Sequence, residues 1–238
     1  MVNQLPLLER VRPFLKNNTF LGGLPDHALN DLIAKGHIRK YSRGETIYRR
    51  QDPGDTLMMV LMGRIKVTNV NADGREIVLA FLAPGDLNGE IAVLGGKERS
   101  ANAIAVEQSE AFVLYARDLV PVLCAHPNVM LEIMQVLCEK LRLASAVIED
   151  NTLEMSARAA KGLLRLAEQF GKREKAGIRL DLKVSQSELG KYLNLSRANV
   201  SRQLGRLKEA NVIELLGTQI VIVDEDGLME IADTSSKD

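Results

Sequence analysis

The chain has 238 residues, of which 46% are hydrophobic and 26% are charged, with 31 basic and 31 acidic side chains. This composition is typical of a soluble globular protein of one large or two medium domains. No apolar run approaches the roughly 20 residues that cross a bilayer, and the first residues lack the charged-then-apolar order of a signal peptide. A cytoplasmic protein without a membrane partner is therefore predicted.

The net charge of zero conceals an uneven distribution along the chain. Residues 156–223 carry 13 Lys and Arg against 6 Asp and Glu, whereas residues 224–238 carry one Lys against six acids. A polyanion responds to the local field, whatever the total charge of the protein. The positive segment is therefore the region where we expect a polyanionic partner.

The first half of the chain changes character near His37. Residues 1 to about 36 are predicted to be helical, with Leu29, Leu32 and Ile33 on one face. From His37 to Tyr115, short β-type runs recur between glycine turns, which predicts a sandwich or barrel. These runs are residues 46–48, 57–61, 65–68, 76–82, 101–106 and 111–115.

A long uninterrupted helix is predicted from about Asn128 to Glu154. A set of mostly apolar positions in it alternates steps of four and three residues, which is an a/d heptad seam. They are Met130, Met134, Leu137, Leu141, Ala144, Ile148, Asn151 and Met155. A polar Asn151 on such a seam can fix the register of two strands. The alternative is a helix packed on its own domain, but a helix between two domains has few such partners, so a homodimer is predicted.

Residues 185–204 have the pattern of a helix-turn-helix. Ser185 is a good N-cap with Glu188 three residues later, as in a capping box. Asn194 tolerates the left-handed conformation that the turn needs. Ser196 is a good N-cap for the second helix. An ordinary helical hairpin is the alternative, but the caps and the turn agree on double-stranded DNA as the partner.

The second helix of this motif has two different faces. Val200, Leu204 and Leu207 recur at helical spacing and are expected to face the core. Arg197 and Arg202 project from the N-terminal half, the part that meets base edges in the major groove. The β-type runs 213–216 and 220–223 then predict a hairpin, which would make a winged helix-turn-helix. Residues 171–177 are predicted to be a charged loop.

One stretch of the predicted barrel carries the residues that a phosphodiester needs. Arg99 can supply a cation, Ser100 a hydroxyl donor, and Gly89 a close approach of the backbone. Glu90 can accept a hydrogen bond from a ribose 2′-hydroxyl. The alternative is that Glu90 and Arg99 only pair with each other structurally.

With these motifs in place, the chain resembles the cyclic-AMP receptor protein and fumarate–nitrate-reductase regulator (CRP/FNR) family of bacterial transcription factors. The resemblance covers nearly the whole length. It rests on Gly-Asp-Leu-Asn-Gly-Glu-Ile at 85–91, Glu-Arg-Ser-Ala at 98–101, the helix after Pro127, and Leu-Ser-Arg-Ala-Asn-Val-Ser-Arg at 195–202. It implies an α+β protein with a β-roll sensor domain (1–127), a long dimerisation helix (128–155) and a winged helix-turn-helix domain (156–238).

The resemblance also implies roles for individual residues. In the cyclic-nucleotide branch, the positions of Gly89, Glu90, Arg99 and Ser100 bind the sugar and the cyclic phosphate, and Ile91 completes the motif. The residues expected near the base are Val67, Leu79, Lys140 and Ser145. Where the family has a threonine that binds the adenine amino group, this chain has Ala144, so the choice between cyclic AMP and cyclic GMP stays open.

For DNA, the resemblance implies a two-fold symmetric site read by a homodimer, with RNA polymerase as a further partner. The expected DNA contacts are Gln186, Ser187, Ser196, Arg197, Asn199 and Arg202. The first two should contact phosphates and the two arginines guanines. Ala198 replaces a glutamate that accepts from cytosine, so the half-site should be altered at that base pair. Target promoters, and activation versus repression, do not follow from the sequence.

Other functions fit the sequence less well. Cys124 and Cys138 match no zinc or iron–sulfur spacing and are expected to serve packing, so no metal site is predicted. A haem-sensing roll would need an axial ligand from His27, His37 or His126, and a roll that binds no ligand is the other alternative. A phosphodiesterase would need a His/Asp metal cluster, so no enzyme is predicted.

Overall fold

The computed structural model describes residues 6–71, 73–217 and 219–233. Its contacts divide into two compact units, residues 1–141 and 142–238. The boundary lies inside the long helix α5 (Pro127–Asp150), so this one helix belongs in part to each unit. The predicted three-part division at residues 127 and 155 stays a prediction.

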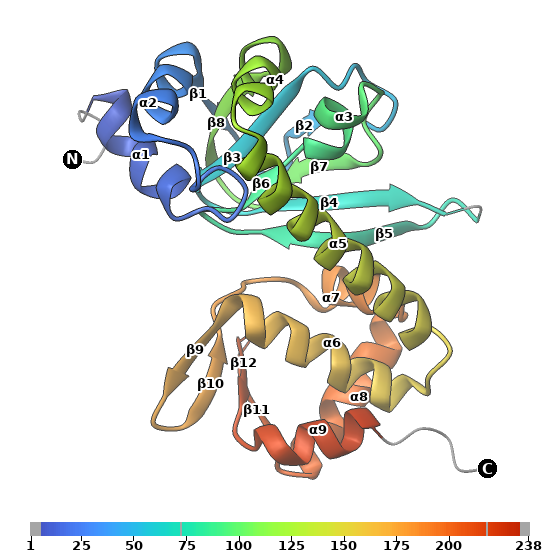
Figure 1. The fold of residues 1–238 in the computed structure, drawn as a ribbon. Helices are drawn as coiled ribbons and strands as arrows, with labels where there is room; N and C mark the ends of the chain where they lie inside the picture. The colour runs from blue at the N-terminus through green and yellow to red at the C-terminus, as the bar shows by residue number, and fades with distance from the viewer. Residues whose placement is uncertain (1–5, 72, 218, 234–238) are drawn as a thin grey trace. The chain divides into compact units, whose positions relative to one another are not determined.

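The described residues of the first unit form two four-stranded antiparallel sheets (Figure 1). One has the order β1-β8-β3-β6, with β1 His37–Tyr41, β3 Thr56–Met62, β6 Leu87–Asn88 and β8 Ser109–Tyr115. The other has the order β2-β7-β4-β5, with β2 Thr46–Tyr48, β4 Ile65–Val70, β5 Glu76–Leu82 and β7 Asn102–Ala105. All six predicted runs are strands, and the predicted roll of short strands is confirmed.

Alternation along β3 shows how the first sheet is buried on both faces. Leu57 and Met59 belong to one apolar cluster together with residues of the helices, whereas Met58 and Val60 belong to a second cluster inside the roll. Successive side chains of a strand point to opposite faces, so a strand covered on both sides reads as a continuous apolar run. This is why residues 57–61 are apolar throughout.

Helices α1 (Leu7–Lys16), α2 (Asp26–Lys35) and α4 (Ala116–Ala125) contribute to the first of these clusters. Leu29, Leu32 and Ile33 are buried on one face of α2, as predicted. Residues 17–25 are not helical, so the prediction of a helical segment up to residue 36 is wrong there. Pro25 explains the interruption, because a proline disfavours helical geometry in the residue before it. The part of that prediction that falls on residues 1–5 lies outside the described residues.

Helix α5 ends at Asp150, so the prediction that it runs to Glu154 is wrong. The Asn151 side chain donates to the Val147 carbonyl oxygen at 2.9 Å, and a turn follows before α6 (Met155–Phe170) begins. Asparagine side chains compete in this way for backbone groups and favour helix ends. Asn151 and Met155 are therefore not positions of the α5 seam.

The remaining seam positions of α5 differ in exposure. Met130 and Leu137 pack against the core cluster of the first unit. Other apolar side chains of the helix are exposed, and Leu141 and Ile148 are each 69% exposed. The exposed set is Leu131, Met134, Leu141, Leu143, Val147 and Ile148. Leu131, Met134, Leu141 and Ile148 share one face of the helix, and an apolar stripe of this kind is a candidate contact surface.

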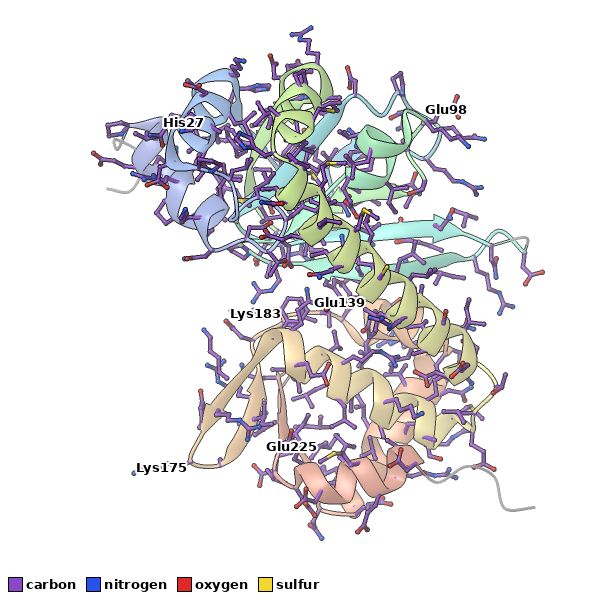
Figure 2. The ribbon with its side chains drawn as sticks, viewed as in Figure 1. His27, Glu98, Glu139, Lys175, Lys183 and Glu225 are labelled. Carbon is purple, nitrogen blue, oxygen red and sulfur yellow. The ribbon has the colours of Figure 1, made fainter. Side chains whose placement is uncertain are left out.

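The second unit contains α6, α7 (Gln186–Leu193), α8 (Arg197–Glu209), α9 (Glu225–Asp233) and a four-stranded sheet. The sheet order is β11-β12-β10-β9, with β9 Gly171–Glu174, β10 Gly177–Leu180, β11 Ile213–Leu216 and β12 Gln219–Ile222. The predicted hairpin of β11 and β12 is confirmed; Thr218, in its loop, lies outside the described residues. Figure 2 shows Lys175 at the tip of the β9–β10 hairpin.

The prediction of a charged loop at 171–177 is therefore wrong. Ile178 of β10 pairs with Ile222 of β12, and both side chains are buried. This apolar pairing stabilises the sheet to which β9 adds, although the β9 residues themselves are mostly charged. Gly177 has a φ of +126°, and a Cβ there would lie 2.1 Å from the Ile222 carbonyl oxygen. Only glycine fits this close approach of two strands.

Three further observations concern membrane-spanning helices, the cysteines and metal-binding clusters. Among the described residues no single helix is long and apolar enough to cross a membrane; α4 and α5 reach that length and composition only as a pair bent by 113°. Cys124 and Cys138 are exposed free thiols, so the expectation that they pack in the interior is wrong. The described part of the chain contains no cluster of three or more His, Cys, Asp or Glu that could hold a metal ion.

Candidate functional site

Arg99 lies buried in the loop before β7. Its backbone N–H donates to the Asp52 carbonyl oxygen at 2.9 Å, and its own carbonyl oxygen accepts from the Gln51 N–H at 2.9 Å. The side chain is 5% exposed, and its Nη2 donates to Thr56 Oγ1 at 2.6 Å. Its Cζ lies 4.2 Å from the centroid of the Tyr48 ring. The loop and two strands therefore hold one cation in place.

Two nitrogens of this guanidinium, Nε and Nη1, are buried and have no hydrogen-bond partner. A buried donor without a partner costs about 1–3 kcal/mol, and more when it is charged. Gly89 adjoins it with a φ of +99°, and a Cβ there would lie 2.4 Å from Nη1. The backbone of this loop can approach the cation only because residue 89 is glycine. The arrangement suits an anion that binds both free nitrogens.

Glu90 begins α3 (Glu90–Gly95) and is 3% exposed. Its Oε1 accepts from Lys140 Nζ of α5 at 2.7 Å, while its Oε2 is buried without a partner. A carboxylate accepts hydrogen bonds only, so Oε2 is matched to a hydroxyl or amide donor. The structure thus places a free cationic donor and a free acceptor on either side of Gly89.

An open cavity of about 560 Å³ lies at the loop that carries Arg99. It is lined by Arg50, Gln51, Lys97, Glu98, Arg99 and Ser100. Gly89 and Glu90 do not line it, so the cavity covers only the Arg99 side of the predicted site. Ser100 is exposed at its edge. Figure 2 shows Glu98 pointing outward from the loop after α3.

The other predicted ligand residues are more scattered. Ile91 is 56% exposed on α3. Val67 is buried in the cluster inside the roll, while Leu79 is 52% exposed beside a bulge between β4 and β5. Ser145 is exposed on α5 and belongs to the second unit, so its contact with a ligand stays a prediction.

Sequence reasoning missed three residues around Arg99. Thr56 and Tyr48 contact the guanidinium, and the Tyr48 hydroxyl donates to Asn88 Oδ1. Burial raises the pKa of the Tyr48 hydroxyl above its ordinary value, so the phenol stays protonated even in alkaline solution. Asn88 lies inside the 85–91 motif, which was a signal for it, but nothing local distinguishes Tyr48 from any other strand aromatic.

The helix-turn-helix of the second unit has the predicted local geometry. Ser185 Oγ accepts from the Glu188 N–H at 3.2 Å, and the capping box is complete. Asn194 is left-handed, with φ 52° and ψ 45°. Ser196 Oγ accepts from the Asn199 N–H at 3.2 Å. These caps satisfy N–H groups that would otherwise be unpaired at both helix starts.

The two faces of α8 are also as predicted. Val200, Leu204 and Leu207 are buried. Arg197 and Arg202 are exposed, and the Arg202 Nη1 lies 3.5 Å from Asn199 Oδ1. Gln186, Ser187, Ser196 and Ala198 are exposed as well, whereas Asn199 is half-buried. The described residues leave this helix start free to meet a partner such as the major groove.

Three polar contacts join Asp150, the last residue of α5, and Asn151, which follows it, to the rest of the second unit. The buried Asp150 carboxylate accepts from Arg165 of α6 and lies 3.4 Å from Lys161 Nζ. Asn151 Oδ1 accepts from Asn194 Nδ2 at 3.0 Å, at the turn between α7 and α8. The last turn of α5 is therefore joined to the helix-turn-helix itself.

Comparison with known proteins identifies both domains. Residues 38–126 match the cyclic nucleotide-binding domain model, and residues 157–231 match the Crp-like helix-turn-helix domain model. The chain is 30% identical over 217 residues to the cyclic AMP receptor protein of Thermus thermophilus, covering 91% of this chain and 97% of that protein. It is 27% identical over 189 residues to a CRP-like cAMP-activated global transcriptional regulator of Mycobacterium tuberculosis, covering 79% and 84%.

The fold is similar to that of solved structures as well. FixK2 from Bradyrhizobium japonicum superposes with a TM-score of 0.75 at 23% identity, covering 84% of this chain and 99% of that one. At this identity the likeness concerns the fold alone: a sheet-rich domain, a long helix and a helix-turn-helix domain.

Proposed function

Because the chain belongs to the CRP/FNR family of transcription regulators, we propose that it binds a cyclic nucleotide in its first unit and thereby controls DNA binding by its second unit. The ligand class is a purine 3′,5′-cyclic monophosphate. The regulator acts as a homodimer on a two-fold symmetric DNA site. Its relatives are transcription regulators, and the same role is assigned to this chain.

The observation that carries the proposal is the pair of unsatisfied groups around Gly89. Arg99 offers two buried N–H donors, and Glu90 offers one buried acceptor oxygen. A ribose cyclic phosphate presents an anion and, next to it, a 2′-hydroxyl donor, so one ligand satisfies both residues. A structural ion pair between Glu90 and Arg99 is not formed; Glu90 pairs with Lys140 instead.

For DNA binding, the proposal rests on the exposed start of α8. Arg197 and Arg202 each suit a bidentate contact to guanine, whereas Ala198 can touch only a thymine methyl. Gln186 and Ser187 at the start of α7 suit phosphate contacts. The exposed stripe of α5 supplies the dimer contact. The two recognition helices of the dimer then enter successive major grooves, which lie one DNA turn, ~34 Å, apart. A contact with RNA polymerase stays a prediction.

The signal is proposed to travel through α5. Lys140 of this helix pairs with Glu90, and the other end of the helix is bonded to the turn before α8 through Asn151 and Asn194. A ligand on Glu90 therefore acts beside a residue of the helix that leads to the DNA-reading motif. It shifts DNA binding only as far as its affinities for the two states differ.

Calorimetric titration of the full chain with cyclic AMP and cyclic GMP tests this function. We expect saturable binding of at least one of them, and DNA binding to a selected symmetric site that strengthens at saturation. No binding of either nucleotide would favour a roll that senses another ligand or none. Equal DNA affinity with and without saturating nucleotide would contradict the proposed control.

A further inference from the structure

Tyr48, at the end of β2, contacts both halves of the proposed nucleotide site. The Cζ of Arg99 lies 4.2 Å from its ring centroid, and its hydroxyl donates to Asn88 Oδ1. Asn88 ends β6 and immediately precedes Gly89 and Glu90. One aromatic side chain therefore joins the cation of the site to the loop that carries its carboxylate.

The contacts of Arg99 show why such a side chain matters. Among the described residues the side chain donates one hydrogen bond, from Nη2 to Thr56 Oγ1 at 2.6 Å, while Nε and Nη1 have no partner. One hydrogen bond leaves a planar guanidinium free to turn about it. A ring stacked on its face removes that freedom, and the cation–π attraction is stronger where the cation is buried, as Arg99 is.

The environment of Tyr48 suits this role. A tyrosine phenol is neutral at physiological pH, and burial raises the pKa of Tyr48 further, so its hydroxyl remains a donor to Asn88. Tyr48 lies on β2, which pairs with β7, the strand that follows Arg99. Strand pairing thus holds the ring and the cation at a fixed distance, before any ligand arrives.

We propose that Tyr48 is a positioning residue for cyclic-phosphate recognition: its ring fixes the plane of the Arg99 guanidinium, and its hydroxyl fixes the Asn88–Glu90 loop beside it. The inference rests on the proposed function, in which Arg99 binds the phosphate. Preorganisation of this kind raises affinity because the site no longer has to be ordered when the ligand binds.

Two substitutions distinguish the contribution of the Tyr48 ring from that of its hydroxyl. Tyr48→Phe keeps the ring and loses only the hydroxyl, so cyclic-nucleotide affinity should fall by about threefold. Tyr48→Leu loses the ring as well, and affinity should fall by about 10- to 30-fold. The matched control is Tyr115→Leu, which removes another Arg–Tyr stack of the same unit, with Arg117 Cζ 4.6 Å from the ring centroid. That variant should bind within twofold of the parent.

A double-mutant cycle shows whether Tyr48 acts through Arg99. Arg99→Lys keeps a positive charge but has no plane to orient, so binding remains measurable. In the Arg99→Lys background, Tyr48→Leu should lower cyclic-nucleotide affinity by less than about threefold, instead of 10- to 30-fold. If Tyr48→Leu lowers affinity as much in the Arg99→Lys background as in the parent, Tyr48 acts independently of Arg99 and the inference is overturned.

The readout is calorimetry on the full chain with cyclic AMP and cyclic GMP, together with the thermal unfolding midpoint of each variant. If the parent binds and Arg99→Met abolishes binding, but folded Tyr48→Leu binds within twofold, the positioning role is wrong and the proposed function stands. If the parent binds neither nucleotide, or Arg99→Met binds as the parent does, the proposed function itself fails. If Tyr48→Leu and Tyr48→Met both fail to fold, Tyr48 is a core residue, and the inference is overturned.

Discussion

Lys140 and Glu90, fifty residues apart in the sequence, form an ion pair in which Lys140 Nζ lies 2.7 Å from Glu90 Oε1. The carboxylate is 4% exposed, whereas the lysine side chain is 46% exposed. The long helix therefore supplies the cation for the most important buried acceptor of the proposed nucleotide site. The second oxygen of Glu90 remains available for a ligand hydroxyl.

Replacing this lysine should destabilise the first unit modestly. Lys140→Met leaves a buried carboxylate without a cation, which we expect to lower the free energy of unfolding by ~1 kcal/mol, since the lysine is half-exposed. The double variant Lys140→Met/Glu90→Gln should recover most of that loss, as measured by urea unfolding. Lys35→Met, at an exposed lysine, is the control and should leave stability unchanged.

Arg99 should serve ligand binding at some cost to the stability of the free protein. Arg99→Met removes two buried unpaired donors, so the unliganded protein should be no less stable than the parent in urea. Cyclic-nucleotide binding should weaken by ~2–5 kcal/mol, because a buried phosphate loses its charged partner. Arg50→Ala changes an exposed arginine that lines the cavity, and it should weaken cyclic-nucleotide binding far less than Arg99→Met does. Similar binding losses for both variants would place the phosphate elsewhere.

The dimer contact can be tested at the exposed apolar positions of α5. Leu141→Asp together with Ile148→Asp should give a folded monomer, because both side chains are 69% exposed in a single chain and so add nothing to its core. Sedimentation velocity gives the oligomeric state, and circular dichroism shows whether the variant is folded. The control is Glu139→Lys, since Glu139 lies on the face of the helix opposite to Leu141 and Ile148. A folded double variant that still sediments as a dimer would show that the contact lies outside this stripe.

For the recognition helix, sequence specificity should depend on Arg202. Arg202→Ala should cost ~1–3 kcal/mol on a selected symmetric site and much less on random DNA, because the lost contact reads a base edge. Ala198→Glu should shift the preferred half-site at one base pair, since a carboxylate accepts from cytosine N4. Lys208→Ala, in the last turn of α8, is the control. Equal losses on specific and random DNA would mean that Arg202 contacts only the backbone.

In the second unit, stability should depend on Asp150. Asp150→Ala leaves Arg165 and Lys161 without the buried carboxylate that both face, and we expect a loss of ~3 kcal/mol in the free energy of unfolding. Chemical denaturation of the full chain measures the loss, and hydrogen exchange shows whether the amides that lose protection belong to the second unit. Glu168→Ala changes an exposed acid of α6, the helix that carries Lys161 and Arg165, and should have little effect. A loss of the same size for Glu168→Ala would contradict a specific role for Asp150.

The sequence by itself determined those features whose causes are local. The capping box of Ser185 and Glu188, the left-handed Asn194, and the cap of Ser196 each depend on residues within a few positions of one another. The strand runs of the roll and the buried face of α8 follow from periodicities of two and 3.6 residues. The motif around Glu90 is likewise a contiguous string of residues.

Only the tertiary structure decided the features that depend on distant partners. The end of α5, the β9–β10 hairpin, the Lys140–Glu90 ion pair and the stacking of Tyr48 on Arg99 each join residues far apart in the sequence. A heptad pattern continues through Met155 in the sequence, but Asn151 bonds to Val147 and Asn194, and the helix ends. Local patterns predict an element and its faces, whereas the partner that ends it or orients its side chains is fixed by the packing of the whole unit.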